Sequence, residues 1–278
     1  MKKYKHYLNG KYVTEEKLLI SPRDLGFMRS YAVFTKVKTY NCKPFKLQEH
    51  ISKLLKSAKL INLKHDYNSE KLTVIIKKTL RVNNDGNEKT LKIMLSGGIS
   101  DTMQQLLKAS LIIIIDPLKQ RKAEIYTKGV KINMIKFTRY LPRAKSTDYI
   151  EGVKQTQIGK KKGFFEPLYY SDKQVYECSN SNIFIVKNKK IYTPKDNVYP
   201  GILRGVLIYN LKNKLKIKEK NFNIKSLLNA DEVFITGSGK EIVPVIKIDK
   251  HIIGNGKVGE ITKFTIKTLN EFKNSKVW

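Results

Sequence analysis

Two glycine-containing stretches in the second half of the chain have residue types that suit an anion. Gly237-Ser238-Gly239 follows an apolar run, so backbone N–H groups can approach an anion closely and the Ser238 hydroxyl can add a hydrogen bond. Pro200-Gly201 precedes a predicted helix, whose first N–H groups and dipole also favour negative charge. Each stretch alone is more often an ordinary loop or helix start. Their occurrence in one half of the chain favours an anion-binding protein.

A cluster of small polar residues begins at Glu177. Residues 177–182 lead into the apolar run Ile183–Val186, and such a cluster either lines a pocket or forms a solvated hairpin turn. The four histidines and the cysteines Cys42 and Cys178 lack the spacing of metal ligands, so we expect no metal site and no disulfide framework. Because the chain has 48 Lys, spacing alone does not identify a reactive lysine. These residues predict an anion site without specifying a reaction.

Hydrophobic patterns predict the elements that carry these residues. Strands show an alternation of period two, and helices show an apolar face of period 3.6. The predicted strands lie at 32–40, 90–95, 111–115, 130–137, 166–171, 181–186, 190–193, 232–236 and 245–248, with a hairpin at 7–13. The predicted helices lie at 47–58 and 69–80, from about 146, at 200–215, and in a C-terminal amphipathic segment with Ile261, Phe264, Leu269 and Phe272.

The order of these elements predicts a mixed α/β or α+β protein with two domains. A length of 278 residues is typical of one large or two modest domains, and the short polar segment after Pro117 is the best candidate for a linker. We therefore expect a small N-terminal domain at 1–117, a linker at 118–124 and a larger C-terminal domain at 125–278.

The net charge of +31 raises the question of nucleic-acid binding. Only seven of the 55 basic residues are Arg, the side chain that binds phosphate with two parallel hydrogen bonds. The Lys are spread along the whole chain rather than gathered in one tail or stripe. A compositional bias toward Lys explains this pattern better than a nucleic-acid surface, so we expect no nucleic-acid partner.

Nothing in the sequence suggests a membrane or secretory location. The longest apolar run, Leu111–Ile115, is far shorter than the ~18–20 residues that cross a bilayer. Met1–His6 lacks the apolar stretch of a signal peptide, and two isolated cysteines are typical of a reducing compartment. We expect a cytoplasmic protein without membrane contact.

An ordered set of motifs resembles the class IV aminotransferases, which are fold-type IV enzymes that use pyridoxal 5'-phosphate. The family contains branched-chain aminotransferases, D-amino-acid aminotransferases and aminodeoxychorismate lyase. The resemblance covers almost the whole chain, and an ordered set is far more specific than a single string. The matching segments are Leu8–Gly10, Ser21–Phe27, Lys43–His50, Lys145–Tyr149, Glu177–Val186, Thr193–Pro194, Gly201–Arg204, Ala230–Ser238 and Glu241–Val245.

The resemblance implies three residues that act on the cofactor ring. Lys145 would hold the cofactor covalently through its amine and carry the proton at the substrate Cα. Glu177 would bind the pyridine nitrogen and keep it protonated, and Tyr149 would bind the phenolic oxygen. The implied fold is a small N-terminal α/β domain followed by a larger β-barrel-like domain with helices.

The resemblance also implies a phosphate site. Main-chain N–H groups at Ile202 and Leu203 would bind the phosphate together with Ser238, so the two anion-binding stretches become one site. Lys53 stands where many members have an Arg that binds phosphate. Its compact ammonium cannot bind two oxygens in parallel, so cofactor affinity is expected to be lower.

Substrate binding would involve residues from both halves of the chain. Gly239 and Lys240 would offer backbone donors to the substrate carboxylate. The segment that contains Arg29 and Tyr31 replaces a glycine-rich element that lines the substrate pocket in the family. We hypothesise that Arg29 or Lys92 binds a substrate carboxylate.

The implied protein is a homodimeric aminotransferase that moves an amino group between an amino acid and a 2-oxo acid such as 2-oxoglutarate. Branched-chain L-amino acids are the first expectation for the donor, because this activity is the commonest in the family. D-amino acids come second and the lyase third. A basic nucleic-acid-binding protein is a remote alternative from another class.

Overall fold

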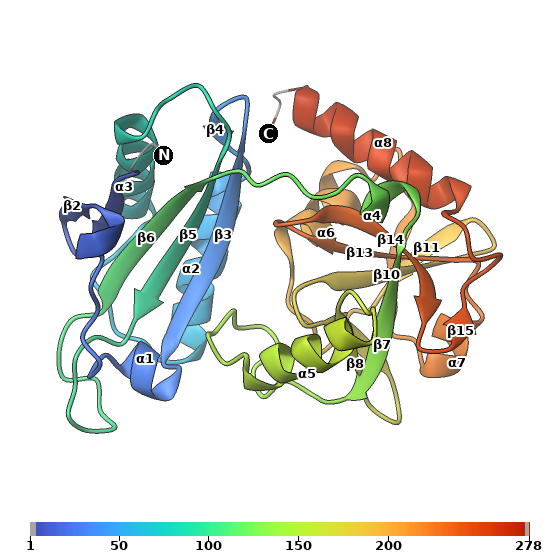
Figure 1. Ribbon diagram of the computed structural model, residues 1–278, viewed down its shortest axis with the longest axis horizontal. Coiled ribbons are helices and arrows are strands. Elements are labelled where there is room, and N and C mark those ends of the chain that lie inside the picture. The colour runs from blue at the N-terminus through green and yellow to red at the C-terminus, as the bar shows by residue number, and fades with distance from the viewer. Residues whose placement is uncertain (1–3, 276–277) are drawn as a thin grey trace. The chain divides into compact units, whose positions relative to one another are not determined.

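The structure is a computed structural model that describes residues 4–275 and 278 (Figure 1). Residues 1–3, which belong to the segment predicted to lack a signal peptide, lie outside the described residues. The chain divides into two compact units. Unit 1 comprises Met1–Lys119 and Ala144–Asp148, and unit 2 comprises Gln120–Arg143 and Tyr149–Trp278. The domain boundaries expected from the sequence stay a prediction, and they do not anticipate that residues 144–148 belong with unit 1.

Unit 1 is built on a six-stranded antiparallel sheet with the strand order β2-β1-β6-β5-β3-β4. The strands are β1 (His6–Leu8), β2 (Lys11–Val13), β3 (Ala32–Tyr40), β4 (Lys43–Pro44), β5 (Lys89–Ser96) and β6 (Ser110–Pro117). The helices are α1 (Leu25–Arg29), α2 (Leu47–Leu60) and α3 (Ser69–Val82), with a 3₁₀ turn at Glu15–Lys17.

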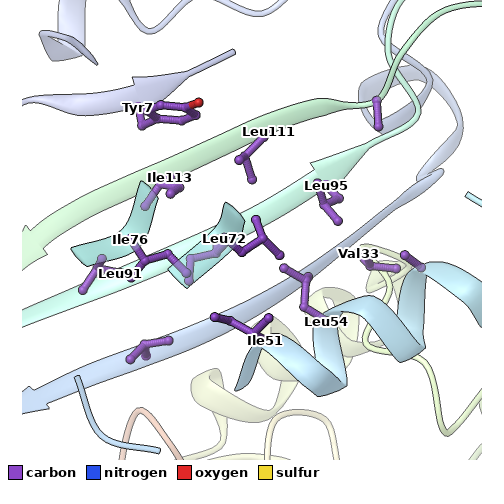
Figure 2. Packing of buried hydrophobic residues seen from close by; sticks show 14 of the residues in the cluster. Tyr7, Val33, Ile51, Leu54, Leu72, Ile76, Leu91, Leu95, Leu111 and Ile113 are labelled. Atoms are coloured by element: carbon purple, nitrogen blue, oxygen red, sulfur yellow. The ribbon is translucent and has the colours of Figure 1, made fainter. Parts of the chain in front are cut away.

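The core of unit 1 lies between the sheet and helices α2 and α3. Because side chains alternate along a strand, Val33 and Val37 of β3 enter this core. Ile51 and Leu54 of α2 point toward the sheet from the facing helix (Figure 2). Burial of each such side chain stabilises the fold by roughly 1.5–3 kcal/mol. By the same alternation, Phe34 lies on the opposite face of the sheet.

Unit 2 is built on a nine-stranded mixed sheet with the order β12-β11-β10-β13-β14-β7-β8-β9, and β15 pairs with β14. The strands are β7 (Val130–Lys136), β8 (Pro167–Tyr170), β9 (Val175–Cys178), β10 (Asn182–Lys187), β11 (Lys190–Thr193), β12 (Ile217–Glu219), β13 (Glu232–Gly237), β14 (Glu241–Ile248) and β15 (His251–Ile252). The helices are α4 (Glu124–Thr127), α5 (Ile150–Lys161), α6 (Ile202–Gly205), α7 (Ile224–Leu228) and α8 (Glu260–Asn274), and a π-helical turn spans Val206–Asn210.

The predicted fold class is confirmed: both units combine helices and strands, and the sheet of unit 2 is a half-barrel. The predicted hairpin forms β1 and β2, with Asn9 and Gly10 at positive φ in its turn. A turn follows β15, with positive φ at Gly254 and Gly256. Among the described residues, no helix has the length and apolar character required to cross a membrane.

The helix predicted from about 146 begins later, at Ile150. The preceding residues are extended and pair with β3 instead. The Phe34 N–H donates to the Lys145 carbonyl (2.9 Å), and the Thr147 N–H donates to the Ala32 carbonyl (3.0 Å). This pairing joins segments more than 100 positions apart, so local sequence patterns do not reveal it.

Three further expectations differ from the structure. The helix predicted at 200–215 ends with the π-helical turn at Asn210, a residue type with poor helix propensity. Strand β14 begins at Glu241 rather than 245, because Pro244, which usually argues against a central strand, is accommodated within it. The buried face of α8 includes Thr262 and Leu269, whereas Phe264 is exposed.

Candidate active site

Glu177 is a buried carboxylate in strand β9. All four β9 residues are buried, and the Glu177 side chain is 6% exposed. Residues 179 and 180 form the turn that follows β9, and only Asn180 of the cluster is exposed. Its Oε2 accepts hydrogen bonds from the Asn182 side-chain amide (3.2 Å) and from the Tyr199 backbone N–H (3.0 Å). A buried carboxylate is costly unless it is hydrogen-bonded and paired. These donors therefore hold the Glu177 carboxylate in one orientation.

Arg139 supplies the positive charge beside this acid. Its Nε lies 3.3 Å from Glu177 Oε1, and its Nη2 donates to the Ser179 carbonyl (2.5 Å). The guanidinium carbon lies 4.9 Å from the centroid of the Tyr149 ring, a cation–π distance. Burial alone would lower the pKa of Arg139, but the nearby charge of Glu177 and the tyrosines raise it. Arg139 is therefore a permanent cation at this site.

Three tyrosines surround the ion pair of Arg139 and Glu177. The Tyr149 and Tyr169 rings both lie against the guanidinium, with centroid distances of 4.9 and 5.5 Å. Burial, followed by the charges of Tyr149 and Glu177, raises the pKa of Tyr199. Burial also raises the pKa of Tyr169 to about 12, although Arg139 opposes this shift. Tyr169 and Tyr199 therefore keep their hydroxyl protons at neutral pH.

Asn182 connects Glu177 to strand β13 and to the start of α6. Its amide also donates to the Tyr199 carbonyl (2.7 Å), and it lies directly opposite Thr236 in the β10–β13 ladder. A Cβ atom on Gly201 would lie 2.2 Å from Asn182 Oδ1, so only glycine allows the chain to approach this closely. The Thr236 hydroxyl is buried and has no hydrogen-bond partner among the described residues.

The residues of unit 2 that are predicted to bind phosphate directly follow Gly201 and Thr236 in the chain or lie two residues beyond them. Ile202 and Leu203 are the first two residues of α6, directly after Gly201, and both are buried. The first N–H groups of a helix have no intrahelical acceptor, so they can bind a ligand. Ser238 is half-buried and lies two residues after Thr236, just beyond the end of β13.

The loop after β13 is fixed by hydrogen bonds to its backbone. The Gly239 carbonyl accepts from Arg121 Nε (3.3 Å), and the Lys240 carbonyl accepts from the Tyr126 hydroxyl (3.1 Å). The Lys240 N–H donates to the Gly237 carbonyl (2.9 Å) and closes a turn. The two carbonyl contacts orient the peptide groups of the loop before any ligand binds.

The side chain of Lys240 makes a buried ion pair with Glu166. The two side chains are 9% and 3% exposed. Lys240 Nζ also donates to Ser181 Oγ (2.8 Å), and that hydroxyl donates to Glu166 Oε2 (2.9 Å). Glu166 in addition accepts from the Asn180 N–H. This ion pair joins the loop after β13 to the segment that links Glu177 with Asn182.

In unit 1, Lys145 is held against β3 and α2. Its N–H donates to the Ser57 hydroxyl (3.1 Å), which itself donates to the Lys53 carbonyl of α2 (2.8 Å). The Lys145 ammonium lies 4.9 Å from the centroid of the Phe34 ring, within cation–π range. The backbone of Lys145 is thus fixed from two sides, and its amine lies on the face of the sheet that is opposite the core.

His50 is buried between the elements that hold Lys145. Its Nδ1 is 2.7 Å from the Thr35 hydroxyl, and burial together with the charges of Lys53 and Lys145 lowers its pKa to about 3. His50 is therefore neutral at physiological pH. The predicted site residues Lys53 and Lys145 thus belong to one group with Ser57 and His50.

The remaining predicted substrate residues of unit 1 lie on other elements. Arg29 is exposed at the end of α1, with its Nε 3.4 Å from Met103 Sδ. Lys92 is exposed on β5, directly opposite Lys36 of β3. Tyr31 is half-buried just before β3. The structure does not group Arg29 with Lys92.

Sequence reasoning missed several residues of the candidate site. Arg139, Asn182 and Tyr199 contact Glu177. Thr236 lies opposite Asn182, and Glu166 fixes the loop after β13. One signal was available for Arg139: Arg is scarce in this Lys-rich chain, so each Arg deserves a specific reason. The other residues lie in or beside motifs but gain their contacts only through folding.

The chain is similar to known proteins over almost its whole length. The family model described as Amino-transferase class IV matches residues 32–248. A Methanocaldococcus jannaschii protein provisionally named as a branched-chain-amino-acid aminotransferase is 32% identical, over 97% of this chain and 96% of that protein. The D-alanine aminotransferase of Staphylococcus haemolyticus is 26% identical, over 98% of this chain and 99% of that protein.

Solved structures share the fold. The crystal structure of the branched-chain aminotransferase from Thermoproteus uzoniensis with norvaline has a TM-score of 0.89 at 24% identity. The superposition covers 99% of this chain and 97% of that chain. The arrangement of helices and strands along almost the whole chain is therefore that of a known enzyme fold.

Proposed function

The chain belongs to the class IV aminotransferase family, and we propose that it transfers amino groups between branched-chain L-amino acids and 2-oxo acids such as 2-oxoglutarate. Members of this family use pyridoxal phosphate, and this chain is a pyridoxal-phosphate-dependent transaminase. The name of the Methanocaldococcus jannaschii relative, which is 32% identical, supports the branched-chain substrate.

The donor set of unit 2 fits pyridoxal phosphate. A pyridine nitrogen that must stay protonated needs a buried carboxylate, which Glu177 provides with its orientation fixed by Asn182 and Tyr199. A phosphate needs several donors, and the orphaned Thr236 hydroxyl lies two residues before Ser238. The fixed Glu177 carboxylate is the observation that carries the proposed function.

Lys145 and Glu177 have the central roles in the proposed reaction. When bound, the cofactor supplies an aldehyde that reacts with amino groups and a ring that accepts electrons from the substrate Cα. The Lys145 amine would hold the cofactor covalently and, once the substrate amine has displaced it, would move a proton at Cα. The Ser57 hydroxyl and the Phe34 N–H fix the Lys145 backbone, so the amine is presented reproducibly. Glu177 holds the proton on the ring nitrogen.

Other residues bind the remaining polar groups of the cofactor. Tyr149 donates to the phenolic oxygen, and its ring rests on Arg139. Ile202 and Leu203 N–H groups, the Ser238 hydroxyl and the Lys53 ammonium bind the phosphate. The fixed N-terminal turn of α6 supports this assignment, because its backbone donors need no rearrangement.

The substrate carboxylates are bound by a second set of residues. The Gly239 N–H would bind the carboxylate that every amino acid carries, together with the Lys240 N–H, which donates to the Gly237 carbonyl in the structure. In this proposal, Arg29 or Lys92 binds a substrate carboxylate, and Tyr31 lines the substrate pocket. Lys92 is supported by its position opposite Lys36, because two like charges across a strand pair favour an anion between them.

The enzyme is a cytoplasmic homodimer in this proposal. Exposed apolar side chains in unit 1 support a subunit interface, because they lie in two segments that Arg29 and Met103 bring into contact and because monomers rarely expose large contiguous apolar patches. They lie in two segments and are Leu19, Ile20, Phe27, Met28, Ile99, Met103, Leu106 and Leu107. Light scattering during gel filtration would reveal a dimer, whereas the mass of a single chain would contradict this part of the proposal.

An amino-donor screen tests the substrate. The purified enzyme is supplied with 2-oxoglutarate and with single L- or D-amino acids, and glutamate formation is measured. We expect L-leucine, L-isoleucine and L-valine to be the best donors. Activity confined to D-alanine would favour the second candidate, which the 26% identical D-alanine aminotransferase supports. Absence of turnover with every donor would contradict the proposed function.

A further inference from the structure

The hydroxyl oxygen of Thr236 is one of four buried side-chain atoms that have no hydrogen-bond partner among the described residues of unit 2, and it is the only hydroxyl among these four. Thr236 is 1% exposed, and its Oγ1 has no hydrogen-bond partner among the described residues. Buried hydroxyl groups in native proteins nearly always have a partner, because an unsatisfied one is costly. Valine has the same shape and avoids this cost. The hydroxyl therefore needs a reason other than the stability of the folded chain.

The position of Thr236 in strand β13 places it on the functional face of the sheet. Val233 and Ile235 belong to the core of unit 2, so by alternation Phe234 and Thr236 lie on the opposite face. Phe234 stacks there on Phe184 of β10, with ring centroids 4.8 Å apart. Thr236 and Asn182 form the next cross-strand pair on this face.

Asn182, the cross-strand partner of Thr236, connects it to Glu177 and to the start of α6. Thr236 lies directly opposite Asn182, whose amide donates to Glu177 (3.2 Å). Asn182 is also the residue that Gly201 approaches so closely that no Cβ fits. The unsatisfied hydroxyl therefore adjoins the residue that connects the buried carboxylate with the first turn of α6.

We propose that the Thr236 hydroxyl donates a hydrogen bond to the phosphate of bound pyridoxal phosphate, and this inference rests on the proposed function. The phosphate is the matching acceptor because Thr236 is followed directly by Gly237, Ser238 and Gly239 and because the first turn of α6 packs near β13. A charged acceptor also makes the stronger hydrogen bond. The chain thus keeps a hydroxyl that is unsatisfied until the cofactor binds.

Two matched variants test this proposal. Thr236→Val removes the hydroxyl and keeps the shape, whereas Thr236→Ser keeps the hydroxyl. The dissociation constants of pyridoxal phosphate and of pyridoxal, which lacks the phosphate, are measured by absorbance titration of the cofactor-free full chain. The thermal midpoint of the cofactor-free protein is measured in parallel.

We expect Thr236→Val to weaken pyridoxal phosphate binding by about tenfold, the lower end of what a hydrogen bond to a charged group contributes. Binding of pyridoxal should be unchanged, and the cofactor-free variant should melt at the same or a higher temperature than the wild type. Thr236→Ser should bind pyridoxal phosphate like the wild type.

Other results would overturn the inference. Equal loss of affinity for both ligands would show that the hydroxyl does not act on the phosphate. A lower melting temperature of cofactor-free Thr236→Val would show that the hydroxyl has a partner within the protein. Unchanged affinity for pyridoxal phosphate would also reject the proposal. If the wild type itself bound no pyridoxal phosphate, the proposed function would fail instead.

Discussion

Arg139 and Glu177 form a buried ion pair, with 3.3 Å between Arg139 Nε and Glu177 Oε1. The guanidinium is held by the Ser179 carbonyl and lies over the Tyr149 ring, so its position does not depend on Glu177 alone. A fixed cation favours the charged form of a neighbouring carboxylate. In the proposed function, Arg139 would thereby support Glu177 in holding a proton on the cofactor ring, although Arg139 belongs to none of the motifs.

Substitution of Arg139 should impair catalysis through Glu177. Arg139→Met removes the charge, and we expect kcat to fall by about 10–100-fold, the equivalent of one charge-assisted hydrogen bond. Arg139→Lys should lose less, because it keeps the charge but not the planar group that reaches both Glu177 and Ser179. Steady-state rates with leucine and 2-oxoglutarate measure this difference.

Arg143 provides the matched control for these variants. It is an exposed Arg four residues further along the same segment, and Arg143→Met should keep the wild-type kcat. A wild-type kcat in Arg139→Met, with the cofactor bound, would show that Glu177 does not require this cation.

The ion pair of Lys240 and Glu166 makes a prediction about stability. Lys240→Met leaves the Glu166 carboxylate buried without its cation, so the free energy of unfolding should fall by about 3–5 kcal/mol. The double substitution Glu166→Gln with Lys240→Met removes both charges and should recover most of this loss. Denaturant unfolding measures all three proteins. A Lys240→Met protein as stable as the wild type would mean that the pair is not buried as described.

His50 should make the stability of the protein depend on pH. Its folded-state pKa of about 3 lies below the ordinary value of 6.5, so the unfolded chain binds more protons between these values. The stabilising contribution is complete above about pH 6.5 and is lost as the pH falls toward 3. From pH 7 to pH 5, His50 alone should lower the free energy of unfolding by about 2 kcal/mol.

Two histidine variants isolate this effect. His50→Gln should remove that part of the pH dependence, whereas His251→Gln, at an exposed position, should not. Urea unfolding at a series of pH values gives the comparison. An identical slope in His50→Gln and the wild type would contradict the buried neutral state of His50.

Lys92 should select for a second carboxylate on the substrate. Lys92 is exposed on β5, so its ammonium group can pair with the second carboxylate of a dicarboxylic oxo acid. Lys92→Met should raise the KM for 2-oxoglutarate by about tenfold and leave the KM for 4-methyl-2-oxopentanoate unchanged. Arg29→Ala tests the alternative that Arg29 binds this group. Unchanged KM values in both variants would reject both assignments.

Local patterns were sufficient to predict most elements of the fold. Strand β3 has the same bounds as predicted, because alternation over nine residues is a strong local signal. The pairing of residues 145–147 with β3 was not predictable, because it depends on a contact between segments distant in sequence. Strand β14 was predicted too short, because Pro244 obscures a central strand.

In the candidate site, too, some residues could be predicted from the sequence and others could not. Lys145, Glu177 and Ser238 could be named because they lie in motifs that resemble a known family. Arg139 and Thr236 could not be named, because their importance comes from where folding places them beside Glu177 and Asn182. Arg139 lies outside every motif, and a single such residue has no periodicity and no spacing that would distinguish it, whereas Thr236 lies in a motif that does not by itself reveal its burial.

The identity of the lysine that binds the cofactor is the most direct test of the account. The chain contains 48 Lys, so a specific result has little chance of arising by coincidence. The protein is loaded with pyridoxal phosphate, reduced with sodium borohydride, digested and analysed by mass spectrometry. The account predicts that the cofactor is attached to Lys145 and that Lys145→Arg remains unlabelled and inactive. Attachment at a different lysine, or transamination by Lys145→Arg, would contradict it.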